Sequence, residues 1–211
     1  MIRQEIPDDN NDSIYRIFER INTKGTKLSP QEIRTASYNG EFQKLLSEYV
    51  LDTRWTNFIK TKNTRKTHEE LLLRFFALFF DLSNYEAPMK HFLNIYMNKN
   101  RKLLLNDKKV LDDIFNSVFN IVSDSLEKDD ICLNDSRRVN TQLLDSILVG
   151  IANNIKIIKN EDKSFLSDKI KKLKDDISNE KYDYSNYWES RASQNENVKG
   201  RCEITTKLFG N

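Results

Sequence analysis

Residues 71–82 form the most apolar stretch of the chain and limit its fold more than any other feature. Only Arg74 and Asp81 interrupt a run of leucine, phenylalanine and alanine. A helix that is apolar on nearly every face has to be covered on several sides in a soluble protein. The sequence therefore predicts a central helix over about residues 68–82, with other helices packed around it.

The rest of the sequence also favours helices. Five glycines and three prolines among 211 residues leave few breaks, and Leu, Ile, Lys and Glu recur at helical spacing. We expect further helices at 29–38, 41–50, 88–96, 110–126, 143–151, 166–177 and 197–208. The predicted fold class is all-α: a compact multi-helix bundle with at most a short strand or arm at the N-terminus.

We expect residues 1–211 to form a single helical domain. Residues 1–12 are polar and acidic apart from two isoleucines, so they predict an N-terminal arm that cannot fold alone. Residues 180–195 are rich in Tyr and Ser and predict an irregular segment that wraps around the helices.

Residues 14–38 predict a helix, a polar loop and a second helix. The apolar face of the first helix consists of Ile14, Ile17, Phe18 and Ile21. Gly25 supplies a turn, and Ser29 then has the properties of an N-cap, with Pro30 at the first helical position. Glu32 lies three residues after Ser29, which is the spacing of a capping box.

The central helix carries similar signals at its start. Thr67 and Glu70 have the spacing of a second capping box. Glu70 and Arg74 are four residues apart and could form an ion pair, which would need further partners if it were buried. We assign structural roles to Ser29, Glu32, Glu70 and Arg74.

Residues 53–68 contain no acidic residue and form a basic segment. Its candidate nucleic-acid contacts are Arg54, Trp55, Lys60, Lys62, Arg65 and Lys66. Two interpretations stay open. The cations could bind phosphates while the ring of Trp55 stacks on a base, or the segment is a solvated loop that Trp55 and Phe58 anchor to the core.

The net charge of the chain is too small for a strong electrostatic attraction to nucleic acid over its whole surface. With 34 basic and 32 acidic residues the net charge is +2, so any nucleic-acid binding has to be local. Every apolar run is shorter than the roughly 20 residues of a membrane span, and the N-terminus is acidic where a signal peptide is basic. We expect a cytoplasmic protein that has no membrane partner.

The sequence lacks the motifs of several common enzyme sites. The scattered glycines exclude a phosphate loop and a dinucleotide fingerprint. His68, His91, Cys132 and Cys202 do not have the spacing of a metal site, and the two cysteines fit a reduced compartment. We therefore expect no metal and no cofactor, and no catalytic carboxylate pair can be singled out.

Residues 17–34, IFERINTKGTKLSPQEIR, closely resemble a hallmark of the GmrSD-type restriction proteins, a family of bacterial and phage defence. The resemblance continues in residues 70–78 (ELLLRFFAL) and 88–93 (PMKHFL), and more weakly in 140–150 and 198–208. Members of this family have a ParB-like α/β part with an Asp-Gly-Gln-Gln-Arg type motif that binds or cleaves nucleotide, and a helical part packed on it.

That nucleotide motif is absent from the 211 residues. The resemblance therefore implies that the chain is the helical part alone and that residues 1–12 are the remnant of the α/β part. It also implies that a partner subunit or domain carries the ParB-like part, and that apolar side chains are exposed near residues 2–21, where that part would pack.

The resemblance further implies that Arg20, Asn22 and Thr23 face the nucleotide site. Lys24 stands where a glycine is usual in the motif, and Gly25 would let the backbone approach a phosphate. An alternative stays open, in which Asn22 and Thr23 only cap and brace the turn. In that case Arg20 and Arg34 would pair with Glu19, Glu32 or other carboxylates.

Two functions follow as expectations, and a third interpretation, in which the chain is a degenerate remnant that keeps only a stable fold, stays open. The first is a helical module of a GmrSD-like protein that binds nucleic acid, with DNA as a candidate partner, or another protein. The second is an NTP-dependent or nuclease enzyme that acts through Arg20, Asn22 and Thr23, which we consider the weaker expectation because the nucleotide motif is missing.

Overall fold

The computed structural model describes residues 15, 17, 19, 20, 27–133, 138–179, 185–188 and 193–210. Its α-helices are α2 (Pro30–Ser37), α3 (Glu41–Tyr49), α4 (Thr53–Ile59), α5 (Thr67–Asp81), α6 (Met89–Lys99), α7 (Leu105–Ser125), α8 (Thr141–Asn153), α9 (Ile155–Ile158), α10 (Phe165–Ser178) and α11 (Asn195–Phe209). Three short 3-10 helices join them: η1 (Leu82–Asn84), η2 (Lys128–Ile131) and η3 (Ser185–Trp188).

The predicted all-α fold class is confirmed, since the described ranges contain no β-sheet and only one isolated bridge, between Cys132 and Val139. The predicted arm at 1–12 lies outside the described residues. So does most of the segment 180–195, of which the structure describes η3 and the residues from 193 onward.

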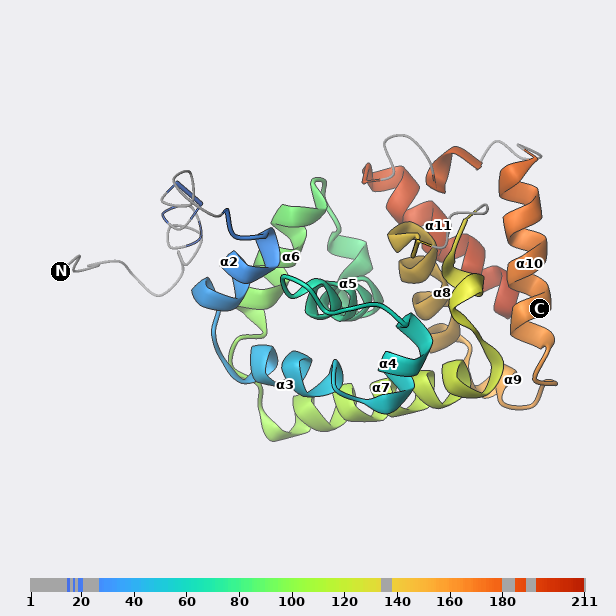
Figure 1. Cartoon of the computed structure of the whole chain (residues 1–211), viewed down its shortest axis with the longest axis horizontal. Helices are drawn as coiled ribbons and strands as arrows, with labels where there is room; N and C mark the ends of the chain where they lie inside the picture. The colour runs from blue at the N-terminus through green and yellow to red at the C-terminus, as the bar shows by residue number, and fades with distance from the viewer. Residues whose placement is uncertain are drawn as a thin grey trace.

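Helix α5 occupies the centre of the bundle, as the apolar run predicts. Figure 1 shows it end-on, with α2 and α6 on one side and α8 on the other. It contacts all three of these helices and α3 as well. Between Leu71 and Leu78 every side chain except that of Arg74 is buried. Burial on all sides is the physical reason for a helix without a polar face.

Helices α8, α10 and α11 form the other end of the bundle (Figure 1). Helix α8 packs on α5 with one face and on α11 with another. The α8–α11 contact is very close at Gly150, where a Cβ atom would lie 2.8 Å from Cδ2 of Phe209 and 2.9 Å from Cβ of Thr205. The hydroxyl of Thr205 donates to the carbonyl of Ser146 at 2.6 Å, so the close approach also satisfies a buried polar group.

Helices α3 and α4 lie against the long helix α7, which runs along one side of the molecule (Figure 1). The rings of Tyr49 and Phe115 stack with centroids 4.1 Å apart, and the Tyr49 hydroxyl donates to Asp112 at 2.6 Å. The packing of α4 on α7 fixes the position of the basic segment, because α4 is part of that segment.

Helices α4, α7 and α9 differ from the sequence prediction, which gives no helix at α4 or at α9. Residues 53–59 form helix α4, which Asp52 caps by accepting a hydrogen bond from the backbone N–H of Arg54 at 2.8 Å. Helix α7 begins at Leu105 rather than near residue 110. Leu104 and Leu105 are 72% and 84% exposed. The first turn of α7 therefore does not show the apolar spacing from which a helix is predicted.

Candidate nucleic-acid interface

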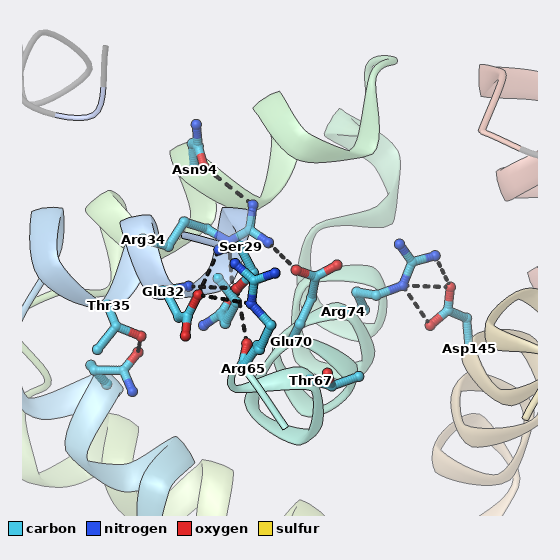
Figure 2. Close-up of polar contacts among 12 residues, drawn as sticks. Ser29, Glu32, Arg34, Thr35, Arg65, Thr67, Glu70, Arg74, Asn94 and Asp145 are labelled. Carbon is cyan, nitrogen blue, oxygen red and sulfur yellow. Dashed lines mark hydrogen bonds and ion pairs between the residues drawn. The ribbon is translucent and has the colours of Figure 1, made fainter. Parts of the chain in front are cut away.

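The basic segment meets the chain at the start of α2. Ser29 follows the predicted phosphate loop by a few residues, and its hydroxyl donates to the backbone carbonyl of Arg65 at 2.9 Å. The Arg65 Nε atom lies 3.4 Å from the carboxylate of Glu32 (Figure 2). The basic segment is thereby held against the N-terminus of α2.

The capping box predicted at Ser29 is present. The Ser29 hydroxyl accepts a hydrogen bond from the backbone N–H of Glu32 at 3.1 Å, and the Glu32 carboxylate accepts one from the backbone N–H of Ser29 at 2.6 Å. This second bond is the main cause that lowers the pKa of Glu32, so the carboxylate next to Arg65 stays ionised. Ser29 therefore fixes both α2 and the basic segment.

Replacing Ser29 by Ala is expected to destabilise the protein by about 1–2 kcal/mol, because the cap and the bond to the Arg65 carbonyl are lost together. Urea unfolding monitored by circular dichroism measures this loss. Thr at the same position keeps both the acceptor and the donor, so Ser29→Thr should restore most of the stability. Equal destabilisation by Ala and Thr would contradict the assigned role of the hydroxyl.

The second predicted capping box is wrong. Lys66 rather than Thr67 is the N-cap of α5, and its side chain makes no capping bond. The amide side chain of Asn63 acts instead: its oxygen accepts from the backbone N–H of His68 at 3.0 Å, and its nitrogen donates to Glu69 at 2.7 Å. With Lys66 as N-cap, Glu70 is one residue too late for a capping box, and its carboxylate accepts from Arg34.

The backbone of the basic segment is constrained beyond this cap. Lys60, Arg65 and Lys66 have φ angles of 46°, 55° and 59°, in the left-handed region. A residue other than glycine destabilises the fold by about 1–2 kcal/mol when it adopts this conformation. The hydrogen bonds and ion pairs around these three residues therefore have to hold the conformation. Residues 60–66, which we call the basic loop, thus have a fixed path between α4 and α5.

Trp55 is not available to a nucleic-acid base. Its side chain is fully buried and packs edge-on against Phe119 of α7 and His68 of α5. Its indole N–H donates to Nδ1 of His68 at 3.2 Å. Phe58 is buried as well. Both rings anchor the segment to the core. Trp55 is therefore not a candidate for contact with nucleic acid.

Arg54 also has a structural role. It forms an ion pair with Asp52 at 2.6 Å, donates to Asn116 and Asn120 on α7, and lies over the ring of Phe115. These contacts join α4 to α7. A phosphate would have to replace them, so Arg54 is a poor candidate for contact with nucleic acid.

The remaining cations keep their charged ends at the surface. The side chains of Lys60 and Arg65 are 54% and 53% exposed, although they are paired with Glu127 at 2.7 Å and Glu32 at 3.4 Å. Lys62 is exposed. Lys66 is paired with the buried carboxylate of Glu69 at 3.2 Å. Lys60, Lys62 and Arg65 are therefore the cations of the basic loop best placed to contact a ligand.

The predicted pair between Glu70 and Arg74 is not formed. The guanidinium of Arg34, 1% exposed, binds Glu70 at 2.5 Å and also donates to Gln31 and Asn94. Arg74 binds Asp145 of α8 through Nε at 3.1 Å and through a second nitrogen (Figure 2). Arg201 of α11 lies 3.8 Å from the same carboxylate. Both residues thus have structural roles, with partners that no local spacing could indicate.

The predicted phosphate-binding residues are only partly visible. Asn22, Thr23, Lys24 and Gly25 lie outside the described residues, while Arg20 is described as exposed. Lys27, which the sequence pattern does not single out, is exposed just before Ser29.

The apolar surface expected near residues 2–21 can be checked at two positions. Ile17 is 41% exposed, whereas Tyr15 is buried and stacks on Tyr38. Lys90 of α6 lies over the Tyr15 ring and forms an ion pair with Glu19.

The described residues include no group of three or more His, Cys, Asp or Glu side chains that could hold a metal ion. Cys132 and Cys202 are both free and buried. Within the same residues, no helix combines the length and the apolar character that crossing a membrane requires. No protein-family model, curated protein or solved structure matches the chain.

Proposed function

We propose that this helical protein binds nucleic acid through its basic loop, residues 60–66, beside the N-terminus of α2. The observation that supports this most is the combination of a fixed backbone with exposed cationic ends on Lys60, Lys62 and Arg65. A loop that is already ordered loses little conformational entropy when it binds. Phosphate oxygens are the ligands that Lys and Arg side chains bind at nucleic-acid surfaces.

The same geometry sets the character of the binding. A phosphate has to compete with Glu127 and Glu32 for Lys60 and Arg65, but such exposed ion pairs contribute only about 0–1 kcal/mol and exchange readily. Because the Trp55 ring is buried, the loop has no aromatic platform of its own. We therefore expect weak contact with the phosphate backbone, strong dependence on salt, and little sequence preference.

Removing the three positive charges of the loop tests this proposal. The variant Lys60→Gln/Lys62→Gln/Arg65→Gln should lose at least tenfold in affinity for a duplex at low salt, where three phosphate contacts weigh most. Lys66 is left in place because it pairs with the buried Glu69. Electrophoretic mobility shift or fluorescence anisotropy measures the change.

A matched control separates local contact from net charge. The variant Lys163→Gln/Lys171→Gln/Lys172→Gln loses the same charge from exposed positions on and before α10, at the far end of the bundle from α2 (Figure 1). It should bind nearly as well as the unaltered protein. Equal loss in both variants would contradict a site at the basic loop, and so would unaltered binding by the loop variant.

We further propose that this module serves a GmrSD-like defence system with a ParB-like partner. The motif of residues 17–34 supports this, as does the exposed side chain of Ile17, its first residue. Titration calorimetry with the ParB-like domain of a GmrSD-type protein should show binding, and Ile17→Glu should weaken it. No heat of binding to such domains would count against this partner.

A further inference from the structure

His68 lies at the junction of α4, the basic loop and α5. It is 3% exposed. Its Nδ1 atom lies 3.2 Å from the indole nitrogen of Trp55 on α4, and its Nε2 atom lies 3.0 Å from the hydroxyl of Thr61 in the loop. Its backbone N–H is bound by Asn63 of the same loop. One residue therefore connects the loop to both flanking helices.

These partners determine which ring nitrogen carries the proton. An indole N–H can only donate, so Nδ1 of His68 has to be the unprotonated acceptor. The neutral ring then carries its hydrogen on Nε2 and donates it to the Thr61 hydroxyl. A second proton could only go to Nδ1, where it would point at the N–H of Trp55 and break that hydrogen bond.

The carboxylates around His68 are already paired with other groups, so they do little to stabilise a positive charge on its ring. Glu69 on α5 is the nearest carboxylate, but it already binds Lys66 and Asn63. On the side of α4, Arg54 binds Asp52, and Lys60 at the start of the loop binds Glu127. Burial lowers the pKa of His68 from its ordinary value, and Glu69 offsets part of this effect.

We propose that His68 is an acid-sensitive latch that holds the basic loop in place while its ring is neutral and releases the loop when Nδ1 is protonated. Release would free Thr61 and the left-handed residues Lys60, Arg65 and Lys66, whose conformation depends on the surrounding bonds. The inference concerns the conformation of the loop and does not rest on nucleic-acid binding. If the proposed function is correct, the latch makes that binding depend on pH.

The sign of the pH dependence follows from the direction of the pKa. The folded protein binds this proton less readily than the unfolded chain does, because the pKa of His68 is lower in the fold. The contribution of the latch is therefore complete above the ordinary histidine pKa of about 6.5. It is lost as the pH falls through the lower pKa of the folded state.

The chain has only two histidines, which makes the experiment simple. His91 is exposed on α6, so His91→Gln leaves His68 as the single imidazole. In this variant, nitrogen chemical shifts from NMR should show the Nε2–H form at pH 7.5. Hydrogen exchange of the amides of residues 60–66, corrected for intrinsic pH effects, should accelerate roughly tenfold or more on acidification, the factor expected when one buried hydrogen bond is lost.

The variant His68→Gln completes the test, because Gln can accept from Trp55 and donate to Thr61 without titrating. Its loop should show no acceleration in the same pH range. The proposal is overturned if the neutral ring carries its proton on Nδ1, if the loop opens equally in His68→Gln, or if the loop of the single-histidine variant opens only together with the whole protein. If His68→Gln does not fold, the ring tautomer and the local exchange of the His91→Gln protein still decide.

Discussion

Replacing Asp145 by Asn is expected to destabilise the protein by about 3–5 kcal/mol, the cost of leaving a buried ion pair with one partner. Asp145 is 1% exposed and faces two guanidinium groups, those of Arg74 and Arg201, whose side chains are 12% and 1% exposed. Neutralising the carboxylate removes the negative charge that faces both guanidinium groups. Thermal unfolding measured by calorimetry should show a fall in midpoint of roughly 10 °C or more.

Two further variants separate this explanation from a general effect of mutation. Asp113→Asn, at an exposed position of α7, should change the stability by no more than about 0.5 kcal/mol. The combined variant Asp145→Leu/Arg74→Met/Arg201→Met removes all three charges and should recover most of the loss, because apolar side chains of similar volume often replace buried ion pairs at little cost. An Asp145→Asn protein as stable as the unaltered one would contradict the role of this cluster.

Replacing Phe76 by Ala is expected to cost about 3–5 kcal/mol, the range for removing a large ring from a packed core. Phe76 is fully buried in α5, and its ring contacts Phe42 and Tyr49 of α3 with centroids 6.4 Å and 5.7 Å apart. The cavity would open where the central helix meets α3. Denaturant unfolding should show a lower midpoint with little change in slope.

Phe80 provides the comparison for Phe76, since it lies one turn later on the same helix and is 42% exposed. Phe80→Ala should cost clearly less than Phe76→Ala, because much of its ring already contacts water. Equal losses at the two positions would mean that the C-terminal turn of α5 is packed as fully as its middle, which would contradict the exposure of Phe80.

The fold was predictable largely because its strongest signals are local. The apolar run of 71–82 placed the central helix within one residue of α5, and the stripe of 143–151 placed α8. Helix α4 is short and lies at the start of a basic segment, so its charge pattern predicts a loop, although Trp55, Phe58 and Ile59 have the helical spacing of a buried face. The sequence does not predict the early start of α7, because the leucines at that end are exposed.

The candidate site was less predictable, since its contacts join residues far apart in the chain. The spacing of Glu70 and Arg74 suggested a pair, but Arg34 and Asp145 bind them from α2 and α8. The contact of Ser29 with the Arg65 carbonyl spans 36 residues. The bond from the backbone N–H of His68 to Asn63 depends on the left-handed residues Arg65 and Lys66 just before α5. Neither is a glycine, so the sequence does not predict their conformation.

The dependence of duplex binding on salt tests the central proposal most directly. Fluorescence anisotropy of a labelled duplex, titrated with the full chain at several salt concentrations, gives the slope of log K against log salt. We expect a negative slope for the unaltered protein, shallower by about 2–3 in the Lys60/Lys62/Arg65 variant, since each lost phosphate contact removes about 0.9. An equal slope in that variant, or no binding at the lowest salt, would contradict a nucleic-acid interface at the basic loop.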